Sequence, residues 1–156
     1  MAAISKHRRK NLEIGNLDPI SEYATRCDKV NQHVLELIKE LNPDFWFIEN
    51  PRACLQNMIW MKPLEEYKHL ITYCAYSQNL PLEQRRMKPT NIWCNIPNPK
   101  FKPPCKNGCL LHVRAPRGSR TGTQGLKNAE MRSMYPQELC EHIMDICEEY
   151  INEPLN

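Results

Sequence analysis

A segment rich in proline and glycine limits where regular structure can form in this chain of 156 residues. Between Asn95 and Lys127 it holds five prolines and four of the five glycines of the whole chain. Proline lacks a backbone N–H, and glycine populates conformations that other residues avoid, so we expect little helix or strand here. The ordered core must therefore come from the residues before Asn95 and from the final segment that begins at Arg132.

The residues ahead of this segment have the pattern of an α/β fold. Apolar residues recur at helical spacing from Ile20 to Leu41. Asp18-Pro19 is a typical N-cap and first helical residue, and Asn42-Pro43 ends the pattern. We predict one long amphipathic helix that packs on a sheet.

Short apolar runs at 45–48, 70–74 and 91–94 are the strand candidates. The run Phe45–Ile48 is continuously apolar, which suits a strand covered on both faces in a parallel α/β sheet. It ends in Glu49-Asn50-Pro51, and open α/β sheets bind their ligands just beyond the carboxyl ends of such strands. A last helix is predicted after Tyr135-Pro136.

Charge is distributed unevenly along the chain. From Gln84 to Ala129 there are ten Lys or Arg and no Asp or Glu, whereas the remainder has eleven basic and eighteen acidic residues. An acid-free basic stretch of 46 residues is the pattern of a surface that binds a polyanion, and it favours a nucleic acid as partner. The alternative, a merely solvated basic surface, usually mixes both signs of charge.

No apolar run approaches the roughly 18 residues that span a bilayer, and the basic N-terminus lacks the features of a signal peptide. We therefore expect a soluble, cytoplasmic protein with no membrane partner. Its eight cysteines are better interpreted as free thiols than as disulfides. A zinc site is an open alternative. The spacing is close to that of zinc ligands for Cys94, Cys105, Cys109 and His112, but the sequence has no paired Cys-x-x-Cys motifs.

Several short sequence motifs follow one another in a characteristic order. They lie at residues 45–52, 86–93, 103–108, 115–125 and 132–136. With them the chain resembles, over nearly its whole length, the C-terminal portion of the small, phage-type cytosine-5 DNA methyltransferases. Members of that family carry a Glu-Asn-Val or Glu-Asn-Pro element at the end of a core strand. A Gln- and Arg-containing element, a variable target-recognition segment and a closing helix follow it.

The resemblance implies catalytic roles for three residues. Glu49 would contact N3 and the exocyclic amine of a flipped cytosine and supply a proton during methyl addition, and Asn50 would fix the loop. Arg86, or Arg85 in its place, would reach the base O2 and a nearby phosphate, because a planar guanidinium suits that cluster of acceptors. The alternative for both arginines is a solvated loop.

The resemblance also implies contacts with double-stranded DNA. Arg and hydroxyl side chains suit phosphate oxygens, and Arg also suits guanine edges. The alternatives are a disordered surface loop for the glycine-rich stretch and a frayed basic arm for the N-terminus. The implied DNA-binding residues are Arg85, Lys88, Thr90, Arg117, Ser119, Arg120, Thr121, Thr123, Lys6, Arg8 and Arg9.

For the fold, the resemblance implies part of a Rossmann-like methyltransferase sheet without its leading strands. Residues 1–17 would form a basic arm and 18–94 a partial catalytic α/β domain. Residues 95–131 would form the basic DNA-recognition segment, and 132–156 a C-terminal helix that returns to the α/β core.

Two elements of the family are missing from the sequence. Members bind S-adenosyl-L-methionine with a glycine-rich loop and supply the nucleophile from a Pro-Cys or Pro-x-Cys element, both ahead of the Glu-Asn element. Here one glycine precedes Glu49, and the only Pro-Cys pair is Pro104-Cys105. In the resemblance Met1 lies where the catalytic loop of the parent ends.

We therefore expect an enzyme part that is inactive alone or active only with a complementary N-terminal methyltransferase chain, which would complete the S-adenosyl-L-methionine site. Without that chain, the strand at 45–48 would have an unpaired edge and the protein would be marginally stable. The alternatives are a non-catalytic DNA-binding module and a phage interaction protein derived from a methyltransferase.

Overall fold

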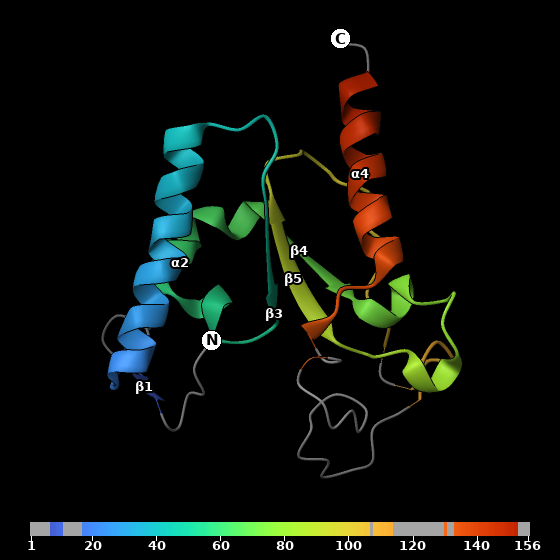
Figure 1. The fold of residues 1–156 in the computed structure, drawn as a ribbon, viewed down its shortest axis with the longest axis horizontal. Helices are drawn as coiled ribbons and strands as arrows, with labels where there is room; N and C mark the ends of the chain where they lie inside the picture. Colours follow the sequence, from blue (N-terminus) through green and yellow to red (C-terminus); the bar gives the residue numbers. More distant parts are fainter. Residues whose placement is uncertain (1–6, 11–16, 107, 114–129, 131–132, 153–156) are drawn as a thin grey trace. The chain divides into compact units, whose positions relative to one another are not determined.

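The computed structural model describes residues 7–10, 17–106, 108–113, 130 and 133–152. Within them the chain has a mixed α/β architecture, as the sequence predicts (Figure 1). The strands are β1 (Arg8–Lys10), β2 (Leu17–Pro19), β3 (Phe47–Pro51), β4 (Lys68–Thr72) and β5 (Pro89–Cys94). The α-helices are α2 (Glu22–Leu41) and α4 (Gln137–Asn152), and four 3-10 helices are η1 (Cys54–Asn57), η2 (Ile59–Tyr67), η3 (Tyr73–Tyr76) and η4 (Leu82–Gln84).

The two sheets in this part of the chain are small and antiparallel. β1 pairs with β2 in the register that places Arg9 opposite Asp18, and a second sheet has the strand order β3–β5–β4. Next to the adjacent ends of β4 and β5, the N–H of Tyr73 donates to the carbonyl of Lys88 at 3.2 Å. The parallel sheet expected from the run Phe45–Ile48 is wrong. Its four residues are only partly buried, so the strand is not covered on both faces as that expectation required.

Helix α2 begins later than the sequence predicts. Ser21, in an extended conformation, is the N-cap, and its Oγ accepts the N–H of Ala24 at 3.2 Å. Asp18-Pro19 belongs to β2 instead, because this stretch pairs with β1. The predicted end is confirmed: Asn42 adopts a left-handed conformation with φ 41° and donates its N–H to the carbonyl of Ile38.

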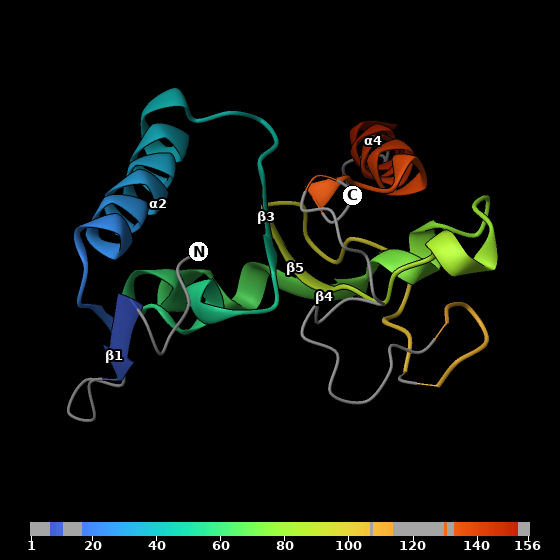
Figure 2. The ribbon, with the colours of Figure 1, turned by 60° about the horizontal axis from the view of Figure 1, so that its bottom comes forward.

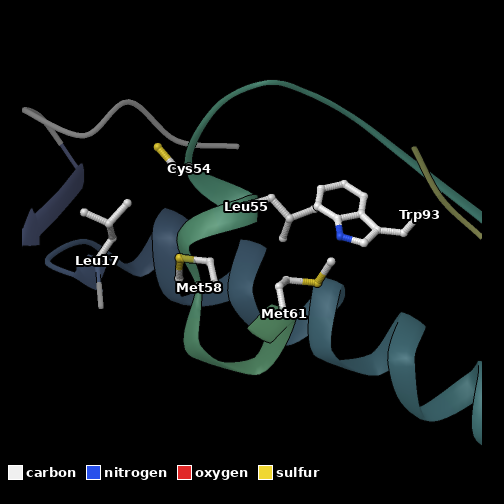
Figure 3. Packing of buried hydrophobic residues seen from close by; sticks show 6 residues of the cluster. All are labelled: Leu17, Cys54, Leu55, Met58, Met61 and Trp93. Atoms are coloured by element: carbon white, nitrogen blue, oxygen red, sulfur yellow. The ribbon is translucent and has the colours of Figure 1, made fainter. Parts of the chain in front are cut away.

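The chain divides into two compact units, of which the first comprises Met1–Lys68 with Trp93–Asn95. In its core Leu17, Cys54, Leu55, Met58, Met61 and Trp93 pack together (Figure 3). Leu35 of α2 packs against this cluster, and four of its six members, Cys54, Leu55, Met58 and Met61, lie in or between the 3-10 segments η1 and η2. Figure 2 shows these segments, coloured green, below α2. Sequence periodicity did not predict these segments, and η2 is long for a 3-10 helix at nine residues, with Pro63 inside it.

The second unit comprises His69–Ile92 with Ile96–Asn156. Its buried residues include all four members of η3 and Leu139 and Ile146 of α4. Helix α4, predicted from the apolar spacing after Pro136, contacts η3. Across the described ranges of the chain, no helix is both long and apolar enough to cross a bilayer.

Candidate functional site

Glu49 and Asn50 lie inside β3 and are half-buried, rather than just beyond the end of the strand as predicted. Asn95 holds the chain where it enters β3. Its Oδ1 accepts the N–H of Trp46 at 3.0 Å, and its Nδ2 donates to the carbonyl of Asp44 at 2.8 Å. The backbone that carries the carboxylate and the amide is therefore anchored by side-chain hydrogen bonds, which a base-contacting pair requires.

Sequence reasoning missed the role of Asn95. The only signal in the sequence was that Asn95 directly follows a predicted strand. An amide side chain there can form hydrogen bonds with backbone groups that have no partner in the sheet. Nothing in the local pattern pairs it with Asp44 and Trp46, which lie about fifty residues earlier.

The two arginines that compete for one role have different surroundings. Arg85 closes its own loop: Nε donates to the carbonyl of Leu80 and Nη2 to that of Gln78, both at 2.8 Å. Arg86 reaches across 48 residues, where its Nη2 donates to the carbonyl of Met134 at 2.9 Å. Burial lowers the pKa of Arg86 from its ordinary value, which for a guanidinium lies so far above physiological pH that the side chain stays cationic.

Arg86 also lines a pocket of about 290 Å³ in the second unit, together with Tyr76, Tyr135 and Gln137. A cation in a concave wall that also carries aromatic rings is a suitable setting for a planar or anionic ligand. Of the two arginines, Arg86 is therefore the better candidate for contact with a ligand, and Arg85 has a structural role in the loop.

Lys88 and Thr90 were both predicted to contact DNA, and the structure separates them. The Nζ of Lys88 lies 4.4 Å from the centroid of the Tyr73 ring, in cation–π contact, and the side chain is half-buried. Thr90 has no exposed surface, and its Oγ1 donates to the carbonyl of Lys88 at 3.3 Å. The assignment of Thr90 as a DNA contact is therefore wrong, because a phosphate cannot reach a fully buried hydroxyl.

Arg8 is a second correction. It was predicted as a phosphate contact, but its side chain is buried in an ion pair with Asp28 of α2. Nη1 donates to Asp28 Oδ2 at 3.0 Å and to the carbonyl of Leu17 at 3.1 Å, and Nη2 pairs with Asp28 Oδ1. The hydrogen bond to Asp28 raises the pKa of Arg8, and the guanidinium has no surface left for a phosphate.

Arg9 is exposed, so its predicted DNA contact stays a prediction. The other predicted contacts lie outside the described residues: Lys6, Arg117, Ser119, Arg120, Thr121 and Thr123.

A cluster of cysteine and histidine side chains occupies one corner of the second unit. The ligand atoms of Cys74, Cys105 and His112 lie within 4.8 Å of one another, and Cys105 Sγ is 2.8 Å from Cys74 Sγ and 3.6 Å from His112 Nδ1. The Sγ of Cys109 is 3.3 Å from His112 Nδ1. The group that the spacing predicted as a possible zinc site thus forms, with Cys74 in place of Cys94.

The cluster is partly shielded from solvent. Burial raises the pKa of the Cys105 thiol and lowers that of His112 below its ordinary value, so the imidazole is neutral at physiological pH. Pro104-Cys105 was the only Pro-Cys pair that could have held a nucleophile, and a raised thiol pKa is the opposite of what an activated nucleophile needs.

The loop that carries Cys105 is held by residues that follow Cys74. The hydroxyl oxygen of Tyr76 accepts the N–H of Lys102 at 2.7 Å and lies 3.2 Å from His142 Nδ1 of α4. Burial raises the pKa of Tyr76 to about 12, so the hydroxyl stays protonated. Lys102 also forms an ion pair with Glu138 of α4.

Comparisons with known proteins add no assignment: no protein-family model, no curated protein and no solved structure matches this chain.

Proposed function

We propose that the chain forms the cytosine-contacting and DNA-binding part of a DNA (cytosine-5-)-methyltransferase. The observation that carries the proposal is the pair Glu49-Asn50 on a strand whose entry is anchored by Asn95. A carboxyl group held beside an extruded cytosine can donate a proton to N3, and the adjacent amide can hold that orientation.

The basic residues of the second unit support binding to DNA. Arg86 is held by the Met134 carbonyl in the wall of a pocket, and Lys88 lies over the Tyr73 ring. Both belong to the acid-free stretch from Gln84 to Ala129, which carries ten positive charges. Neutralising several phosphates with such a stretch gives affinity that does not depend on base sequence.

In this proposal the β3–β5–β4 sheet is the remaining part of a Rossmann-like methyltransferase sheet. Strands β3 and β4 lie on either side of β5 and are both antiparallel to it, so β3 and β4 run in the same direction, as two strands of a methyltransferase sheet would. The S-adenosyl-L-methionine site and the cysteine nucleophile would come from a complementary N-terminal methyltransferase chain, and the complex would act on DNA in the cytoplasm.

The test is binding of duplex DNA, measured by fluorescence anisotropy over a series of salt concentrations. Duplexes that differ in a single unpaired base, cytosine or thymine, separate base contact from phosphate contact, since an unpaired base costs least to extrude. We expect the Kd to rise steeply with salt and the cytosine duplex to bind about tenfold more tightly.

The Glu49→Gln variant should lose the preference for cytosine but keep the salt dependence. Glu66→Gln is the matched control, because Glu66 is exposed on η2 and outside the pair. An affinity that does not change with salt would contradict DNA binding. Salt-dependent binding with no cytosine preference in the unaltered chain would instead indicate a DNA-binding module without a catalytic role.

A further inference from the structure

We propose that Cys74, Cys105, Cys109 and His112 bind one Zn²⁺ ion in a closed, structural site. The proposal is independent of the methyltransferase assignment, because it rests on the side-chain geometry of the second unit. Three thiolates and one imidazole are a common ligand set for structural zinc.

The distances between the ligand atoms are close to those of a tetrahedral zinc centre. With Zn–S of about 2.3 Å and Zn–N of about 2.0–2.1 Å, a sulfur and a nitrogen ligand lie about 3.5 Å apart. The observed Sγ–Nδ1 distances of 3.6 Å for Cys105 and 3.3 Å for Cys109 agree with this. Two adjustments complete the tetrahedron. Cys74 and Cys105, with sulfurs 2.8 Å apart, must separate by about 1 Å to reach the edge of about 3.8 Å, and Cys109, which lies outside the group of three ligands within 4.8 Å of one another, must move closer to them.

The backbone around Cys105 and Cys109 is shaped for the site. The N–H of Cys109 donates to the carbonyl of Lys106 at 3.0 Å, which closes a turn between the two cysteines, and Gly108 in this turn has φ +91°. An L-amino acid with a side chain rarely adopts that conformation, so the turn requires glycine. The N–H of Cys105 donates to Thr72 Oγ1 at 2.8 Å, which fixes the first cysteine against the end of β4.

Four protein ligands leave no open position on a tetrahedral ion, so the site is structural rather than catalytic. It joins η3, through Cys74, to a loop from Pro97 to Val113 that contains neither helix nor strand among its described residues. Binding releases the thiol protons of the three cysteines, because the thiolate is the form that binds the metal ion. Soft thiolate ligands favour zinc over magnesium or calcium.

The test is the metal content of the full chain, purified under reducing conditions without a polyhistidine tag and measured by mass spectrometry of the elements. We expect about one zinc per chain. After replacement by Co²⁺, the visible spectrum should show the ligand-field bands of a tetrahedral ion and a thiolate-to-cobalt charge-transfer band. That spectrum reports the ligands directly and does not depend on activity.

Variants identify the ligands. Cys74→Ser, Cys105→Ser and Cys109→Ser should each lose most of the bound zinc, whereas His112→Cys should keep it because four thiolates also hold zinc. Cys140→Ser is the matched control, since Cys140 is exposed on α4 outside the cluster. Cys94→Ala separates this ligand set from the one that the spacing predicted, and it should keep the metal.

Two outcomes would overturn the proposal. One is an unaltered chain that takes up no zinc or cobalt when both are offered under reducing conditions. The other is a Cys74–Cys105 disulfide that peptide mass spectrometry still detects after purification under reducing conditions. Such a bond would leave only Cys109 and His112 to bind the metal. Retention of the metal by His112→Cys shows that the loss in the serine variants comes from the missing ligand rather than from failure to fold.

Discussion

At the scale of single residues, charge alone did not reveal which basic side chains face solvent. Arg8 and Arg9 are neighbours in one basic run, yet Arg8 is 2% exposed and paired with Asp28, whereas Arg9 is exposed. The partner lies 20 residues away on α2, and no spacing rule connects the two positions. Residue type therefore predicted the charge of each side chain, but not whether the side chain is buried or exposed to solvent.

The buried pair of Arg8 and Asp28 should make Arg8 one of the most sensitive positions of the first unit. Arg8→Met leaves the Asp28 carboxylate buried without its partner, and breaking a buried pair in this way costs about 3–5 kcal/mol. We expect that loss in the free energy of unfolding, measured by urea denaturation at neutral pH.

Arg9→Met is the matched control, and it should change the free energy of unfolding by less than about 0.5 kcal/mol. The double variant Arg8→Met, Asp28→Leu should recover part of the loss, because no uncompensated charge remains. Equal losses for Arg8→Met and Arg9→Met would contradict the buried ion pair.

The candidate site shows the same limit of sequence reasoning. Glu49, Asn50 and Arg86 could be singled out only through a resemblance of their chemistry and order to a known family, and their roles stay predictions. The structure gives Arg86 a specific partner in the Met134 carbonyl. Thr90 could not be excluded, because burial depends on how the faces of β5 are covered. The identity of a polar residue in a strand does not show whether its side chain lies on the buried or the exposed face of the sheet.

At the scale of elements, the sequence pattern located both long helices and the strands β3, β4 and β5 but not all of their boundaries, and it missed β1 and β2. The strand candidate at 70–74 corresponds to β4, which lies two residues earlier, and the candidate at 91–94 corresponds to β5, which begins two residues earlier and ends at the predicted residue. The final helix was predicted closely. The direction of the strands could not be obtained in this way, because a short apolar run fits a parallel or an antiparallel sheet when one face is partly open.

The zinc ligands illustrate an element-level ambiguity. Cys74 and Cys94 each end a predicted strand, and both are fully buried, so sequence spacing could not choose between them. The choice depends on which strand end approaches Cys105, and Thr72 Oγ1 makes that contact next to Cys74. Pairing of β4 with β5 is a long-range property that the local pattern does not contain.

The start of α2 provides a test of the corrected boundary. Ser21 accepts the N–H of Ala24 and lies 2.9 Å from His7 Nδ1, so Ser21→Ala removes the cap of the helix. We expect a loss of about 1 kcal/mol in the free energy of unfolding, measured by thermal or urea denaturation. Ser21→Asp should retain most of the stability, because aspartate also caps. No change in Ser21→Ala would mean that the helix begins elsewhere.

At the scale of the whole molecule, apolar surface is left exposed where a partner is proposed. Along α2 the exposed residues recur at helical spacing on one face, and Leu41 is 73% exposed. Among the strands of the described residues, β3 lies at the edge of its sheet, where the proposed complementary chain would add strands. An exposed apolar stripe and an open strand edge commonly mark an interaction surface or a risk of aggregation, which supports the proposed complementary chain. The exposed apolar residues of α2 are Tyr23, Val30, Val34, Leu37 and Leu41.

The metal site gives the last expected outcome, and it concerns how stability is distributed over the molecule. Among its described residues, the loop from Pro97 to Val113 has few backbone–backbone hydrogen bonds, so a zinc ion would add a strong restraint to those that Thr72 and Tyr76 supply. Removing zinc with a chelator should raise amide hydrogen exchange about tenfold or more in residues 73–76 and 105–112, because local opening becomes easier. Exchange in α2, which belongs to the first unit and is capped by Ser21, should not change. An equal rise in α2 would mean that the metal supports the fold of the whole chain. No rise at either place would show that the cluster is held by protein contacts alone.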